Sequence, residues 1–242
     1  MKKYALKSSL ILVLFTCVLS IVSCKKNSQN ECLLKVMYAS GSFGADTTFF
    51  SYNTEKKIIA ATTSSSSNTY IYSGNNYVRK NTSGLFETRD SILIQKDNLI
   101  REIYSFNTAN VLNRKQSYTY NSSDNLIQYT DQNFIPAGVD IYNIDYADGD
   151  VISLNKGITP TATFTYYTDK SAAKGDYLDI FQFINFGFGK YLKSKHLIKT
   201  MKNGSAATVN ISYEFDSHGN VSKLTASDGV NTDTYTYTYT CD

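Results

Sequence analysis

The stretch Thr-Tyr-Thr-Tyr-Thr-Tyr-Thr over residues 234–240 decides the fold class. Tyr and Thr alternate strictly, so Tyr235, Tyr237 and Tyr239 share one face of an extended chain while Thr occupies the other. Both residue types favour a pleated sheet, and a helix would scatter the three tyrosines around its axis. The stretch therefore predicts a β-strand with an aromatic face and a hydroxyl face.

The same two-residue period recurs from Cys32 to the end of the chain, clearly so in the segments 91–94, 99–104 and 209–215. Turn-forming residues separate such segments at hairpin spacing, at 73–76, 96–98, 123–125, 148–150, 203–204, 218–220 and 228–229. We therefore expect an all-β fold, an antiparallel meander of about 12 to 16 strands that curls into a barrel or half-barrel. The strands lack the repeated lipid-facing apolar band of an outer-membrane barrel, so we expect this barrel to lie in water.

One stretch departs from the alternation. Residues 176–186 are nearly continuously apolar, begin with Asp176 at a helix N-cap position and end just before Gly187. This pattern predicts a short helix over about 176–186 that plugs the barrel or covers the sheet. A fully buried strand is the alternative, because short apolar runs are ambiguous.

The first 23 residues have the pattern of a lipoprotein signal peptide. A basic start with Lys2, Lys3 and Lys7 precedes an apolar stretch over 10–22, which is too short to span a bilayer as a helix. The stretch ends in Ile-Val-Ser-Cys at 21–24, which resembles the bacterial lipobox. That resemblance implies removal of residues 1–23 and attachment of diacylglycerol to the Cys24 thiol, with acyl chains such as palmitate holding the protein on a membrane.

Two alternatives compete with this interpretation of the N-terminus. The segment is also compatible with an ordinary signal peptide cleaved elsewhere, or with an uncleaved anchor. Cys17 fits the lipobox poorly, because Leu14, Phe15 and Thr16 precede it. We therefore divide the chain into a signal peptide over 1–23, a polar lipidated tether over 24–31 and one all-β domain over 32–242.

Charge and composition exclude two broad classes of protein. The signal peptide holds three of the 24 basic residues, which leaves 21 against 21 acidic residues in the remainder of the chain. A neutral domain offers no cationic face for phosphates, so we expect no nucleic-acid partner. The 20 Tyr and 13 Phe amount to too much aromatic surface for a disordered chain.

The two cysteines that remain, Cys32 and Cys241, open the first apolar segment and close the last. In the oxidising envelope an even pair favours a disulfide that joins the two ends of the domain. Two unpaired thiols are the alternative, because the separation of their Cα atoms is not encoded in the spacing. No Cys-x-x-Cys motif or Cys/His cluster is present, so the sequence predicts no zinc site, no redox motif and no cofactor.

Several hairpin units share one register, in which an aromatic strand enters a polar turn and an apolar strand leaves it. The unit over 213–221 resembles the YD repeat at Tyr213, Asp216, Gly219 and Asn220, with Phe215 in place of its second Tyr. The unit over 118–127 departs further.

From about residue 32 onward the chain looks like the Bacteroidota lipoprotein domains with a porin-like fold. Four features carry this resemblance: the lipobox, the hairpins, the Leu-Lys-Ser-Lys-His-Leu-Ile segment over 192–198 and the final Tyr/Thr strand. The resemblance implies a β fold and no particular activity.

Catalytic chemistry finds weak support in the sequence. His218 lies in a tight turn between Ser217 and Gly219, where neighbours in sequence do not reach the geometry of a triad. His196 lies among lysines, a setting typical of a solvated strand edge. The run around Asp148 lacks the ligand spacing of a calcium loop. We therefore expect no catalytic residues, no metal and no enzyme activity.

These observations predict a cell-envelope lipoprotein with a non-enzymatic β domain that binds an unknown ligand or partner, an envelope protein or a glycan. A concave apolar or Tyr-lined pocket near residues 176–191 is expected in that case. The alternative is a structural or adaptor lipoprotein with a filled interior, and a carboxylate-dependent hydrolase is a further one. We expect anchoring to the outer membrane, with the periplasmic face favoured over the cell surface because the first acidic residue after Cys24 is as late as Glu31.

Overall fold

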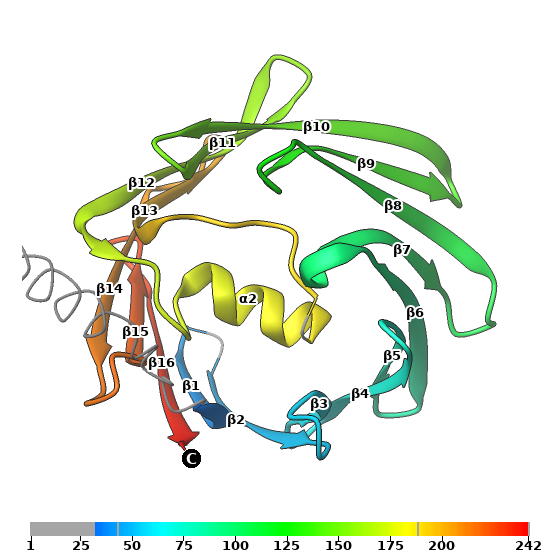
Figure 1. Ribbon diagram of the computed structural model, residues 1–242, viewed down its shortest axis with the longest axis horizontal. Helices are drawn as coiled ribbons and strands as arrows, with labels where there is room; N and C mark the ends of the chain where they lie inside the picture. Colours follow the sequence, from blue (N-terminus) through cyan, green and yellow to red (C-terminus); the bar gives the residue numbers. More distant parts are fainter. Residues whose placement is uncertain (1–31, 43, 188, 242) are drawn as a thin grey trace, which may run out of the picture. The chain divides into compact units, whose positions relative to one another are not determined.

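The computed structural model describes residues 32–42, 44–187 and 189–241. The predicted signal peptide, the lipidation site Cys24 and the tether over 24–31 lie outside the described residues. Residues Leu33–Thr240 form one compact unit. Within this unit, each of sixteen antiparallel strands pairs with its neighbours in the chain, and β16 pairs with β1 to close a barrel (Figure 1). The expected all-β meander is confirmed, and the sheet closes.

The strands in the first half of the barrel are β1 Leu33–Gly41, β2 Gly44–Tyr52, β3 Ile58–Thr62, β4 Ser66–Ser73, β5 Asn76–Ser83, β6 Phe86–Ile94, β7 Ile100–Phe106 and β8 Leu112–Tyr120. Those in the second half are β9 Leu126–Phe134, β10 Ala137–Ala147, β11 Asp150–Lys156, β12 Thr159–Ser171, β13 His196–Asn203, β14 Val209–Phe215, β15 Val221–Ser227 and β16 Thr232–Thr240. The helical elements are η1 Lys96–Asn98 and α2 Tyr177–Phe186.

The strands turn their apolar face toward the lumen, as their alternation requires. In β16, Tyr237 is buried whereas Thr236 and Thr238 are exposed. The buried residues form one cluster that includes Leu34, Phe50, Ile92, Ile103, Leu126, Val151, Ile198, Ile211 and Leu224. The alternate positions carry mostly hydroxyl, amide and charged side chains, such as Thr69, Lys80, Glu87, Lys115, Ser117, Gln132 and Lys223. Burial of the aromatic face therefore stabilises the closed sheet from within.

Tyrosine hydroxyls tie neighbouring strands together at one end of the barrel, which we call the tyrosine end. Each of five lies on an even-numbered strand and donates to a carbonyl at the start of the strand before it. The pairs are Tyr52 to Leu34 (2.6 Å), Tyr72 to Ile58, Tyr120 to Ile100 (2.7 Å), Tyr166 to Val151 (2.7 Å) and Tyr239 to Val221 (2.9 Å). The inward tyrosines thus pack their rings into the core and join neighbouring strands through their hydroxyl groups.

Four hairpins share a five-residue turn in which the first side chain, Asn or Asp, accepts two backbone N–H groups. In the turn over 121–125, Asn121 Oδ1 accepts from Ser123 and Asn125 at 2.9 and 3.1 Å, and Asp124 has φ of 59°. The same pattern begins at Asn53, Asn107 and Asp216, and the fourth residue always has positive φ. This local chemistry explains the shared register of the hairpin units.

The chain leaves the sheet between β12 and β13 and passes through the lumen. Figure 1 shows α2 lying inside the ring of strands. Asp176 caps its first turn by accepting from the Asp179 N–H at 2.9 Å. Gly187 ends it with φ of 60°, where a Cβ atom would come within 3.0 Å of Ile58. The predicted helix over 176–186 is confirmed, and it occupies the barrel.

Candidate functional site

Side chains from β4 and β5 hold the C-terminal end of α2. The last carbonyls of a helix have no partners within it, so they accept bonds from elsewhere. The pairs are Tyr70 OH to Ile184 O at 3.0 Å, Arg79 Nη1 to Asn185 O and Tyr77 OH to Phe186 O. The guanidinium also places positive charge at the negative end of the helix dipole.

The segment that follows α2 is bound to the barrel wall near the start of β7. The Ile100 N–H donates to the Lys190 carbonyl, and the Lys190 N–H donates to the Asn98 carbonyl, both at 2.9 Å. Because the C-terminal end of α2 and the segment after it are fixed in this way, the space beside the helix has defined walls. Two large cavities lie beside α2 in the described part of the chain.

The first, which we call the aromatic cavity, has a volume of about 300 Å³. Its walls come from β5–β9, from β11, from α2 and from the segment after α2; they include Arg79, Asp90, Ser105, Arg114, Gln116, Tyr118, Tyr129, Phe181, Asn185, Phe186 and Tyr191. This size lies at the lower end of the range of small-molecule sites. A Tyr-lined cavity near residues 176–191 is therefore present, as a ligand-binding domain requires.

Two Arg–Asp pairs cross the wall of the aromatic cavity. Arg114 on β8 donates through Nε to Asp131 Oδ1 on β9 at 2.7 Å and through Nη2 to Oδ2. Arg79 on β5 donates to Asp90 Oδ2 on β6 through Nε at 3.0 Å and through Nη2. Such fork-like pairs hold both side chains in one orientation. The Arg114 side chain is still 44% exposed although it points inward, which indicates that water reaches the cavity.

Tyrosines on adjacent strands stack beside these pairs. The rings of Tyr129 and Tyr142 are 4.5 Å apart with an interplanar angle of 7°, and Tyr118 stacks on Tyr129 at 5.9 Å. Burial raises the pKa of Tyr118 and Tyr129 well above the usual tyrosine value, and the neighbouring phenols add to the effect. These rings are therefore neutral aromatic surfaces at physiological pH.

The second cavity, which we call the polar cavity, has about 390 Å³ and lies at the N-terminal half of α2. Its lining includes Asp176, Asp179, Gln182, Lys190, Lys193, Ser194 and His196. Burial raises the pKa of Asp176 to about 6, and the charge of Asp179 adds to that shift.

The interpretation of His196 as a solvated strand edge was wrong. Its Nδ1 lies 2.7 Å from Asp150 Oδ2, and Asp150 Oδ1 accepts the His196 N–H at 2.8 Å. The lysines around it in sequence gave no sign of this partner, which comes from β11. Ser194 is bonded to Tyr166 at 3.0 Å, and no hydrogen bond joins it to His196 among the described residues, so the Ser, His and Asp of this cavity do not form a triad.

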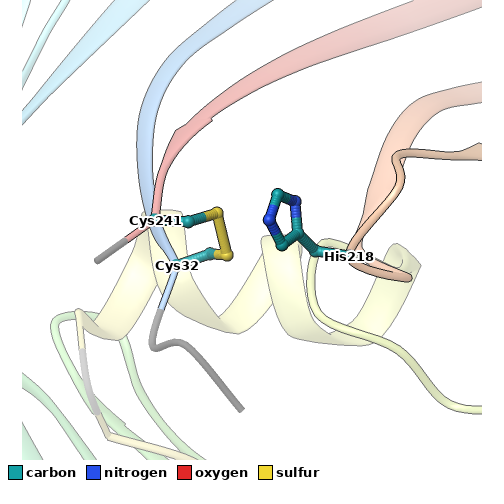
Figure 2. A group of neighbouring side chains, drawn as sticks. All are labelled: Cys32, His218 and Cys241. Atoms are coloured by element: carbon teal, nitrogen blue, oxygen red, sulfur yellow. A yellow bond between two sulfur atoms is a disulfide. The ribbon is translucent and has the colours of Figure 1, made fainter.

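The cysteine pair is oxidised in the structure. Cys32 and Cys241 form a disulfide that joins residues 209 apart in sequence (Figure 2). Their sulfurs are bonded to each other and therefore offer no thiolate to a metal. Cys24, the predicted lipidation site, lies outside the described residues.

Two inward-facing carboxylates of the barrel wall, Asp131 and Asp140, are each paired with a different cation. Asp131 and Asp140 are register partners on β9 and β10, yet each has its own cation. Asp131 binds Arg114, whereas Asp140 binds Lys156 Nζ at 2.7 Å. This arrangement differs from a hydrolase site, where two carboxyl groups flank one bond. His218 lies in the turn that follows β14, where its N–H donates to Asp216 at 2.8 Å.

The sequence pattern did not predict which residues line the aromatic cavity. Arg79, Asp90, Arg114 and Asp131 are polar residues at inward positions of strands that also carry aromatic or aliphatic residues on the same face. A strand-by-strand register is needed to see that they face the same space, and the sequence by itself does not supply one.

Two solved structures of porin-like proteins are similar to this chain, and the first of them shows that the fold is shared. One, from Bacteroides uniformis, is 15% identical with a TM-score of 0.62, and the match covers 86% of this chain and 98% of that chain. Another, from Bacteroides vulgatus, is 12% identical with a TM-score of 0.47, over 87% of this chain and 99% of that one. No protein-family model and no curated protein matches the chain. Among the described residues, no helix has the length and apolar character needed to cross a bilayer.

Proposed function

We propose that this protein is a lipid-anchored protein of the cell envelope, and that its barrel binds a small ligand in the aromatic cavity without catalysing a reaction. The observation that carries ligand binding is the cavity itself. It is walled by stacked tyrosines and oriented Arg–Asp pairs, and the C-terminal end of α2 is fixed beside it. A filled interior, as expected for a purely structural barrel, would leave no such space.

Two observations support anchoring through the N-terminus. The lipobox at 21–24 ends in Cys24, and the strands carry their apolar face inward, the reverse of the arrangement in a barrel surrounded by lipid. β1 begins at the tyrosine end. Ser105 and Arg114 lie toward the opposite end. We place the domain on the periplasmic face of the outer membrane.

The lipid anchor is tested by labelling cells with an alkyne analogue of palmitate. We expect label on the wild type and on Cys17→Ser, and none on Cys24→Ser, which should also leave the membrane fraction. Label retained on Cys24→Ser would contradict the anchor. Protease added to intact cells tests the side: periplasmic placement predicts cleavage after outer-membrane permeabilisation and protection before it.

Ligand binding is tested by native purification followed by mass spectrometry of the extracted small molecules. Ser105→Phe fills the aromatic cavity, whereas Ser117→Phe adds the same ring on the outward face of β8. We expect one compound to accompany the wild type and Ser117→Phe and to be absent from Ser105→Phe. Equal recovery from all three proteins would contradict binding in this cavity.

One observation favours an adaptor role as the second candidate. On the outward face of β1–β3 a hollow of about 350 Å³ is lined by Tyr38 and Phe49, which are 46% and 58% exposed. Exposed aromatic side chains beside a hollow are typical of protein contacts. Crosslinking in cells that is lost in a Tyr38→Ala, Phe49→Ala double variant, with ligand recovery unchanged, would support this role.

A further inference from the structure

The aromatic cavity is electrically balanced. Its two guanidinium groups, Arg79 and Arg114, are each matched by one carboxylate, Asp90 and Asp131. A charged ligand would compete with one member of a pair and leave the other buried without a partner, which is unfavourable. The walls therefore favour a ligand without net charge.

Polar groups that face this cavity retain hydrogen-bonding capacity. Both bonds between Arg79 and Asp90 go to Oδ2, so Asp90 Oδ1 has no hydrogen bond within the described residues. Arg114 uses Nε and Nη2, which leaves Nη1 as a donor, and the Gln116 amide has no side-chain bond in the described part of the chain. Both donors and acceptors thus line this cavity, and a ligand hydroxyl group can bond to either.

Aromatic faces complete the cavity. Tyr118, Tyr129 and Tyr191 line it, and the Tyr129 ring lies between those of Tyr118 and Tyr142, its neighbours on β8 and β10. The negative face of an aromatic ring attracts weakly positive C–H groups, such as those on carbons bonded to oxygen. A ligand with a C–H face and a hydroxyl rim would match both kinds of wall.

We infer that the aromatic cavity binds a neutral, hydroxyl-rich ring, a sugar residue, packed against the tyrosines between the two Arg–Asp pairs. This inference rests on the proposed ligand binding in the same cavity and adds its chemical class. Neutral hydroxyls accept from Arg114 Nη1 and donate to Asp90 Oδ1 without breaking either ion pair. The volume of about 300 Å³ suits a short saccharide rather than a polymer chain.

The test is calorimetric titration of the detergent-solubilised full-length protein with three groups of probes. The neutral sugars are galactose, mannose, N-acetylglucosamine and cellobiose; the charged sugars are glucuronate and glucosamine; the apolar ring is cyclohexanol. We expect at least one neutral sugar to bind, with the charged sugars weaker by about tenfold or more because they disturb a paired charge.

Two pairs of variants locate the site. Gln116→Leu removes an amide that makes no hydrogen bond in the described part of the fold, and Gln132→Leu makes the same change on the outward face of β9. We expect about two- to tenfold weaker sugar binding for the first and no change for the second. Tyr129→Ala, with Tyr104→Ala on the outward face of β7 as its control, should weaken binding by about tenfold through the loss of the ring from the cavity wall.

Each outcome decides between the two proposals. Binding of charged sugars or of cyclohexanol in preference to neutral sugars, reduced by Gln116→Leu or Tyr129→Ala, would overturn the sugar class and leave ligand binding intact. Binding of a neutral sugar that neither cavity variant weakens would place the sugar elsewhere and overturn the inference. No binding of any probe, together with equal compound recovery from wild type and Ser105→Phe, would overturn both.

Discussion

Gln182 and Leu192 hydrogen-bond to each other in both directions. The Leu192 N–H donates to Gln182 Oε1 at 2.8 Å, and Gln182 Nε2 donates to the Leu192 carbonyl at 3.0 Å. Oε1 also accepts the Tyr191 N–H at 2.7 Å, and Nε2 donates to the Leu178 carbonyl at 3.2 Å. Gln182 is 4% exposed, so its amide uses its full bonding capacity inside the protein. This side chain fixes the segment after α2 against the helix.

Gln182→Met is therefore expected to destabilise the protein by about 3 kcal/mol, because backbone N–H groups of the following segment lose their acceptor inside the protein. Urea unfolding followed by tyrosine fluorescence measures the change. Gln132→Met, on the outward face of β9, is the matched control and should shift the free energy of unfolding by no more than about 0.5 kcal/mol. Equal midpoints for the two variants would show that the amide does not hold the segment.

Removal of the Cys32–Cys241 disulfide is expected to lower the stability of the protein. Cys32→Ser opens a loop of 209 residues, which costs about 5 kcal/mol on the chain-entropy account. In a domain of this size we expect the Tm to fall by about 10 °C or more. Cys241→Ser and the double variant should give the same Tm, since one missing thiol already removes the bridge. An unchanged Tm, with both thiols alkylating in the native protein, would contradict a stabilising bridge.

Much of the fold could be predicted because its determinants are local. The Tyr/Thr alternation of 234–240, the Asx turns at Asn121 and Asp216, and the capped apolar stretch at 176–186 each specify an element within about ten residues. Closure of the sheet could not be derived, because pairing of β1 with β16 joins the two ends of the chain. No local pattern records that contact.

The cavities depend on the same long-range information. Arg79 meets Asp90 across one hairpin, but the wall also needs Phe186 from α2, more than 90 residues later in the chain. The prediction of a solvated strand edge at His196 failed for the same reason. Its neighbours in sequence are lysines, while its hydrogen-bond partner Asp150 lies 46 residues earlier. Local composition described the surroundings of these side chains incorrectly because their contacts are distant in sequence.

The N-cap Asp176 predicts a stability that depends on pH. Burial raises its pKa from 3.8 to about 6, the Asp179 charge adds to this, and bonds from the Asp179 and Ala173 N–H groups oppose it. Because the folded state holds the proton more tightly than the unfolded state, this group stabilises the fold below about pH 4, and the contribution is lost as the pH rises through about 6.

Asp176→Asn removes this titration and keeps an N-cap oxygen. We expect the free energy of unfolding of the wild type, relative to the variant, to rise by about 2 to 3 kcal/mol as the pH falls from 7.5 to 4, the range that spans this pKa shift. Urea unfolding across that range measures the difference, and other titrating groups cancel between the two proteins. A difference that stays constant with pH would show that Asp176 has an ordinary pKa.

The inward tyrosines predict the behaviour of the protein in alkali. Burial raises the pKa of Tyr70 and Tyr146 to about 12, against 10.0 for an exposed phenol, and raises that of Tyr77 and Tyr118 well above 10.0. The unfolded chain releases these protons first, so the stability they contribute is complete below about pH 10 and is lost as the pH rises further. We expect most tyrosinate absorbance to develop in one late step that coincides with loss of the β-sheet circular dichroism. In concentrated urea the same titration should be a single transition near about pH 10. Full ionisation near that pH with the circular dichroism intact would mean that the tyrosines do not line a closed, packed barrel.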